Sequence, residues 1–204
     1  MIASPMSAPP PLRWAVRSRP LATETESGDL HLVAPTAGGA LLAVIDGLGH
    51  GPEAAAASRL AAATLREHAD GDPGELINRC HAALRGTRGA AMLVLALSFA
   101  DAVFSWAGIG NVEGWHQRGT RREALVSKAG VVGYQISTPL QRQADLRPGD
   151  LFFLATDGIS PRFADAVRSG GEPEEIAAAV LEKYGRANDD ALVLVARCEG
   201  GPAS

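Results

Sequence analysis

Three strongly apolar stretches of the sequence end or begin at aspartate, and this pattern limits the fold more than any other feature. The stretches and their acidic neighbours are ALLAVI (40–45) before Asp46-Gly47, LFFLA (151–155) before Thr156-Asp157-Gly158, and ALVLVARC (191–198) after Asn188-Asp189-Asp190. Continuous apolar runs bounded by turn residues are typical of strands buried on both faces. The chain is therefore expected to form a sheet core that carries acidic groups at its edge.

The remaining pattern predicts an α+β fold. Further strands are expected at 12–19, 28–35, 90–99, 103–107, 112–116 and 123–126. Helices are expected at 52–69, 73–86, 160–167 and 173–184. Pro52 and Pro73 suit a first helical turn, and Asp72 with Glu75 suits an N-cap. Closely spaced strands with helices before and after them favour a mainly antiparallel sheet sandwich between helices.

Composition excludes several classes of protein. The 204 residues are 46% apolar and 21% charged with a net charge of −4, which is typical of a globular protein and unlike a nucleic-acid binder. No run approaches the ~20 apolar residues of a membrane span. Cys80 and Cys198 lack metal-type spacing and favour a reducing, cytoplasmic location. We expect a leader at 1–11 without signal-peptide character, one domain at 12–198 and a tail at 199–204.

Carboxylates at the ends of neighbouring strands would repel one another. Asp29, at the start of a further strand, joins Asp46, Asp157, Asp189 and Asp190 in this position. A hard divalent cation such as Mg²⁺ or Mn²⁺ would neutralise them, because such ions bind carboxylate, carbonyl and water oxygens. Asp-Gly after a strand is also a common turn, so each motif alone has a plain structural interpretation. The set together predicts a shared metal site.

Two ions bridged by a carboxylate can activate a water for in-line attack on phosphorus, with no nucleophilic side chain. Cysteine-phosphatase, GxSxG and GxxxxGK[ST] motifs are absent from the sequence.

The motifs in this order resemble the metal-dependent Ser/Thr protein phosphatases of the PPM (type 2C) family, and in particular its bacterial SpoIIE-type branch. The matching stretches are ESGD (26–29), VIDGLGHG (44–51), AGIGNV (107–112), LRPGDLFFLATDGIS (146–160) and NDDALVLV (188–195). The resemblance implies an α-β-β-α sandwich with two Mn²⁺ or Mg²⁺ ions between the sheets.

The resemblance also implies roles for individual residues. Asp46 would bridge both ions, and Gly47 would offer its carbonyl to one of them. Asp157 and Asp189 would complete the coordination of the other ion. Asp190 would take the place of Asp189 if the register shifts by one residue. Asp29 would hold the first ion directly or through water. His50 matches a histidine of the family, and would either donate a proton to the leaving oxygen or bond locally at a helix start. Asn111 would either orient the loop beside the ions or serve a turn. The catalytic candidates are accordingly Asp46, Asp157 and His50.

The predicted activity is a protein phosphoserine or phosphothreonine phosphatase. By resemblance, the substrate is a phosphorylated bacterial signalling regulator, such as a STAS-domain anti-anti-sigma or stressosome protein in a stress response. The alternatives are a non-catalytic binding module with the same fold, and a hydrolase of small phosphate esters. Neither nucleic acid nor a membrane is expected as a partner.

Overall fold

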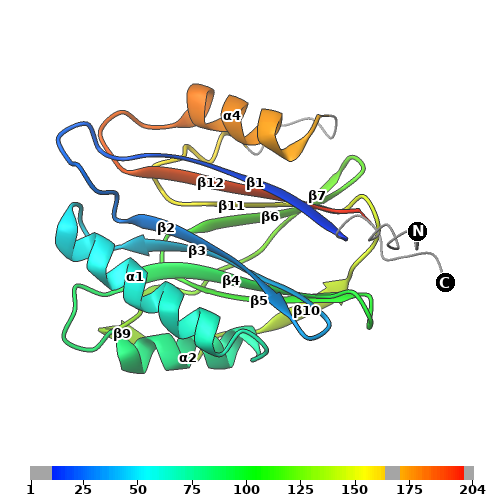
Figure 1. The fold of residues 1–204 in the computed structure, drawn as a ribbon, viewed down its shortest axis with the longest axis horizontal. Coiled ribbons are helices and arrows are strands. Elements are labelled where there is room, and N and C mark those ends of the chain that lie inside the picture. The colour runs from blue at the N-terminus through cyan, green and yellow to red at the C-terminus, as the bar shows by residue number, and fades with distance from the viewer. Residues whose placement is uncertain (1–10, 164–170, 200–204) are drawn as a thin grey trace, which may run out of the picture.

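The computed structural model describes residues 11–163 and 171–199 and arranges them in four layers (Figure 1). Helix α4 (Pro173–Tyr184) covers one sheet, and a second sheet packs behind the first. Helices α1 (Pro52–Glu67) and α2 (Pro73–Ala83) cover the second sheet. The predicted α-β-β-α sandwich is confirmed. Apart from Pro11 and Glu199, the expected leader and tail lie outside the described residues, as does most of the helix expected at 160–167.

The first sheet has the strand order β1-β12-β11-β6-β7, and each neighbouring pair is antiparallel. Its strands are β1 (Leu12–Arg19), β6 (Glu113–Arg118), β7 (Arg121–Ala124), β11 (Leu151–Ala155) and β12 (Ala191–Cys198). All five residues of β11 are buried, as a central strand requires. The first and last strands of the chain, β1 and β12, are neighbours in this sheet.

The second sheet has the order β10-β5-β4-β3-β2, again antiparallel throughout. Its strands are β2 (Asp29–Thr36), β3 (Gly39–Gly47), β4 (Ala90–Ser98), β5 (Val103–Ile109) and β10 (Arg142–Asp145). The small hairpin of β8 (Gly130–Val131) and β9 (Gln135–Ile136) lies beside it, bridged to Ala90 through Val132.

The helices bury small residues against the sheets. Helix α1 (Pro52–Glu67) packs on β2 and β3 through alanines such as Ala57 and Ala61, which are fully buried. Helix α2 (Pro73–Ala83) packs on β4 and β5, and α4 (Pro173–Tyr184) packs on β1 and β12. Asp72 occupies the N-cap position of α2, but its side chain makes no capping hydrogen bond, contrary to the prediction.

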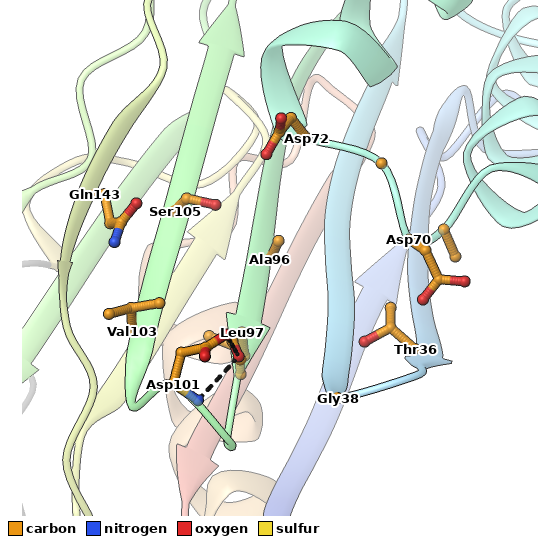
Figure 2. A pocket seen from close by; sticks show the side chains of 13 residues that line it. Thr36, Gly38, Asp70, Asp72, Ala96, Leu97, Asp101, Val103, Ser105 and Gln143 are labelled. Atoms are coloured by element: carbon orange, nitrogen blue, oxygen red, sulfur yellow. Dashed lines mark hydrogen bonds between the residues drawn. The ribbon is translucent and has the colours of Figure 1, made fainter.

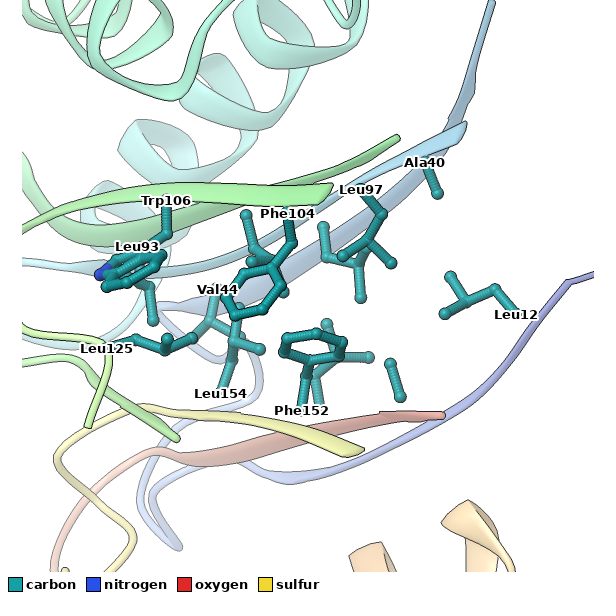
Figure 3. Packing of buried hydrophobic residues seen from close by; sticks show 14 of the residues in the cluster. Leu12, Ala40, Val44, Leu93, Leu97, Phe104, Trp106, Leu125, Phe152 and Leu154 are labelled. Carbon is teal, nitrogen blue, oxygen red and sulfur yellow. The ribbon is translucent and has the colours of Figure 1, made fainter. Parts of the chain in front are cut away.

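The core between the sheets is continuous and apolar (Figure 3). Phe104 from the second sheet meets Phe152 from the first edge-on, with ring centroids 4.9 Å apart. Val44, Leu93 and Leu154 fill the space beside them and are fully buried. Each such side chain contributes roughly 1.5–3 kcal/mol by leaving water. This core fixes the spacing of the two sheets, and hence the spacing of the groups at their edges.

Three short elements were not predicted. Strands β8, β9 and β10 have mostly polar or half-exposed residues and carry no apolar period. The expected strand at 123–126 begins earlier, as β7 over Arg121–Ala124.

Candidate active site

Asp29 and Asp46 lie opposite each other at one end of the second sheet. Asp29 is the first residue of β2, and Asp46 is its direct partner near the end of β3. Side chains alternate along a strand, so Asp46 projects on the same face as Val44, into the space between the sheets. Directly opposed residues share a face, so Asp29 projects the same way.

The first sheet brings three more aspartates to this end of the sandwich. Asp157 follows β11, and Asp189 and Asp190 precede β12, its antiparallel neighbour. The Thr156 N–H donates to the Leu192 carbonyl at 3.0 Å and holds the two strand ends together. A Cβ added at Gly158 would lie 1.8 Å from the Asp190 carbonyl oxygen, so only glycine allows this approach. The five predicted carboxylates thus converge on one edge.

Burial and mutual repulsion change the acidity of these groups. Burial first, with the charges of Asp190, Asp157 and Asp189 adding to it, raises the pKa of Asp29 to about 7. Burial and the charges of Asp29 and its neighbours raise the pKa of Asp46 to about 8. The pKa of Asp189 is raised by burial and by Asp157. The carboxylates are therefore close enough to feel one another, and no neighbouring cation offsets the repulsion at Asp29 or Asp46 among the interactions that set these pKa values.

Hydrogen bonds hold two of these carboxylates. The Thr156 hydroxyl donates to Asp29 Oδ2 at 2.6 Å, and Thr156 itself is fully buried. The Asn111 amide donates to Asp157 Oδ2 at 2.5 Å, which favours the interpretation of Asn111 as a residue that orients the site. Within the described residues, the Asp46 side chain has neither a hydrogen bond nor an ion pair.

Asp190 differs from the other carboxylates. Its Oδ1 accepts the N–H of Leu21 and its Oδ2 accepts the N–H of Gly28, each at 2.8 Å. Only 4% of the residue is exposed. Asp190 thereby fixes both ends of the 21–28 loop between β1 and β2, the loop that leads directly into Asp29.

Gly47 is the last residue of β3, and the loop that follows it carries His50. A Cβ added at Gly47 would lie 2.3 Å from the Ala54 backbone oxygen, so the start of α1 packs directly on this glycine. The Gly47 N–H donates to the Gly28 carbonyl at 3.1 Å. His50 Nδ1 lies 2.7 Å from Glu24 Oε1, in the 21–28 loop. His50 is thus held from another loop as well as lying just before α1.

The carboxylates lie near one another, but they do not form a complete coordination sphere around a single point. Among residues 11–163 and 171–199, no three Asp, Glu, His or Cys side chains are arranged as a formed metal site would need. All of their donor atoms are oxygens. Burial and mutual repulsion raise the pKa values of Asp29 and Asp46, and a bound cation would offset that repulsion. This combination suits a hard divalent cation.

A pocket of about 370 Å³ lies at the end of the second sheet opposite to the five aspartates (Figure 2). Asp70, Asp72 and Asp101 line it. Each accepts a hydrogen bond, from the Ala37 N–H, the Gln141 amide and the Ser98 hydroxyl respectively. These carboxylates fix the turns around the pocket and lie far from the five at the other edge.

Two residues of the site were not singled out from the sequence. Thr156 had a usable signal, since it is a hydroxyl between a buried strand and Asp157. Glu24 had none, because its partner His50 lies 26 residues away and no periodic pattern links them.

No helix in the described part of the chain has both the length and the apolar character to cross a membrane.

Known proteins resemble this chain over most of its length. The family model described as stage II sporulation protein E (SpoIIE) matches residues 36–199. The phosphoserine phosphatase RsbX of Bacillus subtilis (strain 168) is 28% identical over 166 residues, which are 76% of this chain and 78% of that protein.

Solved structures agree. A chain from a structure of the bacterial stressosome superimposes with a TM-score of 0.85 at 32% identity, over 91% of this chain and 99% of that chain. RsbX in complex with magnesium superimposes with a TM-score of 0.83 at 22% identity, over 91% and 94% of the two chains. The chain therefore belongs to the SpoIIE family, within the PPM-type phosphatases, as its motifs predict.

Proposed function

We propose that this protein hydrolyses phosphoserine or phosphothreonine in a phosphorylated bacterial regulator, using two Mn²⁺ or Mg²⁺ ions at the carboxylate edge. One observation carries the proposal. Asp29 and Asp46 face each other from neighbouring strands with pKa values raised to about 7 and 8, beside Asp157 and Asp189 of the other sheet. Within a family of metal-dependent phosphatases, such a cluster is best explained as a cation site.

The ligand roles follow from which carboxylates are free. The Asp46 side chain has no hydrogen bond within the described residues, and the charges of all four other aspartates act on it, so it suits a bridging ligand. Asp157 and Asp189 would hold one ion. Asp29 and the carbonyl of Gly47 would hold the other. Asp190 gives both oxygens to backbone N–H groups, so we assign it as an anchor and Asp189 as the ligand.

The ions, when bound, would supply an activated water and would neutralise charge on the phosphoryl oxygens. The chain's residues supply the rest. Thr156 holds Asp29 in place, and Asn111 holds Asp157. His50 lies in the loop between β3 and α1, and its side chain is 58% exposed. It would donate a proton to the serine or threonine oxygen as that oxygen leaves.

The substrate class rests on the relatives. One is named a phosphoserine phosphatase, and another belongs to a structure of the stressosome. We infer that the substrate is a small phosphorylated regulator, such as a STAS-domain protein. Cys80 and Cys198 are both buried, which fits a reducing cytoplasm. Residues 12–198 would form the single catalytic domain.

The test uses the purified protein with Mn²⁺ or Mg²⁺ and a phosphoserine STAS protein. We expect release of inorganic phosphate that EDTA abolishes and that Asp46→Asn eliminates. Asp145→Asn is the matched control, because this carboxylate is 75% exposed and lies outside the site. Equal activity of Asp46→Asn and wild type would refute the metal assignment.

The alternative, a non-catalytic binding module, is disfavoured because all the strand-edge aspartates remain. Titration calorimetry with Mn²⁺ separates the two functions, since a pure binding module without a metal site would show no heat of binding. A preference for small phosphate esters over the phosphoprotein would instead indicate a metabolite hydrolase.

A further inference from the structure

We propose that Glu24 is a positioning residue for catalysis, which holds the His50 imidazole by Nδ1 so that Nε2 delivers the proton to the leaving oxygen. This inference rests on the proposed phosphatase function and deepens it. The carboxylate and the imidazole are close, with Glu24 Oε1 2.7 Å from His50 Nδ1.

The Glu24 carboxylate is fixed on its other side as well. A Cβ added at Gly51 would lie 2.8 Å from Glu24 Oε2, so this oxygen packs against the backbone at the start of α1. Gly51 has φ +75°, a conformation that glycine adopts readily. Only 22% of the Glu24 side chain is exposed, compared with 58% for His50. Glu24 is therefore the more enclosed partner, whereas most of the His50 side chain is open to solvent.

The loop that carries Glu24 is itself anchored. Asp190 accepts the N–H groups of Leu21 and Gly28, and the Glu24 N–H donates to the Leu21 carbonyl at 2.8 Å. The Ser58 hydroxyl, from α1, donates to the Gly28 carbonyl at 2.5 Å. The pair thus differs from a surface ion pair between two mobile side chains, which contributes little. Its geometry is set by a loop clamped at both ends.

Other charges near this loop are already paired. Arg88 approaches Gly49, since a Cβ there would lie 2.6 Å from its Nη1, and its Nε donates to Glu53 at 2.5 Å. Glu26, in the same loop as Glu24, accepts from Arg59 at 3.1 Å. Glu24 is thus the carboxylate that bonds to His50.

The chemistry assigns a role to each ring nitrogen. With Nδ1–H donating to Glu24, the second nitrogen, Nε2, is the one that gains and loses a proton. Water attacks phosphorus and the bond from phosphorus to the serine oxygen breaks, leaving its electron pair on that oxygen. His50 Nε2–H gives its proton there, so serine and inorganic phosphate are formed, and Nε2 regains a proton from solvent. Glu24 orients the ring through Nδ1.

The test compares Glu24→Gln with Glu26→Gln, which removes a carboxylate from the same loop without touching His50. Each variant is assayed with Mn²⁺ on a phosphoserine peptide and on p-nitrophenyl phosphate, whose leaving group needs no proton. General acid catalysis contributes about 10²–10⁴-fold, so a misplaced acid should cost about tenfold or more. We expect Glu24→Gln to lose about tenfold in kcat on the peptide but less than threefold on the aryl ester. Glu26→Gln should stay near wild type on both, and Glu24→Asp should recover part of the loss.

A second measurement does not depend on activity. Nitrogen NMR of the His50 imidazole in the metal-free protein should show the Nδ1–H tautomer in wild type and a shift away from it in Glu24→Gln. Equal losses on both substrates, or a peptide rate like that of Glu26→Gln, would overturn the proposal, as would an unchanged His50 tautomer. A wild-type protein inactive on both substrates would refute the phosphatase function itself. The proposal would then fall with it, and the NMR result would show separately whether the Glu24–His50 bond exists.

Discussion

Replacing Asp46 with asparagine should stabilise the metal-free protein at pH 8 and abolish its activity at the same time. The carboxylate and the amide have nearly the same shape, so the substitution mainly removes a charge. Burial and the neighbouring aspartates raise the pKa of Asp46 to about 8 in the folded protein, from an ordinary value of 3.8. The folded state therefore binds a proton that the unfolded chain releases, and the free energy of unfolding falls as pH rises from about 4 to about 8.

The size of the effect follows from that shift. Each pKa unit is worth ~1.36 kcal/mol, so the shift of about four units sets an upper limit of roughly 6 kcal/mol at pH 8. At pH 5 only about one unit applies, or ~1.5 kcal/mol. Solvent reaches part of the side chain, and the buried amide needs hydrogen bonds of its own. We therefore expect a net gain of about 2 kcal/mol at pH 8 that largely disappears at pH 5.

The assay is urea unfolding followed by tryptophan fluorescence, in EDTA, at both pH values. Added Mn²⁺ should then stabilise the wild type by mass action and leave Asp46→Asn unchanged, so the order of stability reverses. Asp145→Asn, at an exposed carboxylate, controls for a general effect of removing negative charge. The reasoning is refuted if Asp46→Asn is less stable than wild type at pH 8 in EDTA, or if the gap is as large at pH 5.

Three further predictions test the surroundings of the site. Asp190→Ala should destabilise the protein by about 2–4 kcal/mol in urea unfolding, because the buried Gly28 N–H and the part-buried Leu21 N–H lose their acceptor; a loss below 1 kcal/mol would contradict its role as an anchor. Thr156→Val should raise the pKa of Asp29 above about 7, since the hydroxyl lowers that pKa, and should weaken Mn²⁺ binding at pH 7 more than at pH 9 in calorimetry. An affinity loss that does not depend on pH would count against this explanation. Gly158→Ala should lower Tm strongly or prevent folding, because its Cβ would lie 1.8 Å from a backbone oxygen that cannot rotate away; a Tm within about 2 °C of wild type would show that the backbone can adjust.

The central elements could be predicted because their sequences allow little else. Strand β11 and helix α4 have the predicted bounds, Leu151–Ala155 and Pro173–Tyr184. A five-residue apolar run after Pro-Gly-Asp can hardly be anything but a buried strand, and α4 has proline at its start and glycine after its end. Strand β10 (Arg142–Asp145) could not be found in this way, because its polar residues form a strand only by pairing with β5. Edge strands of this kind are set by their neighbours rather than by their own pattern.

The carboxylate edge could be predicted for a related reason. A charged residue that directly follows a buried strand must lie at the edge of the core. The convergence of Asp46 and Asp157 could therefore be predicted, although the two residues are far apart in the sequence. The sequence left open whether Asp189 or Asp190 faces the others, because a shift of one residue reverses the side-chain direction in a strand. What distinguishes them lies 162 residues away, in the N–H of Gly28 that Asp190 accepts.

Hydrogen bonding therefore offers a physical criterion for separating ligand from anchor among clustered carboxylates. A carboxylate whose two oxygens accept backbone N–H groups has been compensated by the fold, and moving it onto an ion would leave those donors unpaired. Asp190 is of this kind, whereas Asp46 has no such partner within the described residues and an elevated pKa. If the criterion holds, Asp190→Asn should keep much of its Mn²⁺ affinity while losing stability, and Asp46→Asn should do the reverse. The two substitutions would exchange their effects if Asp190 were the ligand, so calorimetry and unfolding on the same pair of variants decide between the two assignments.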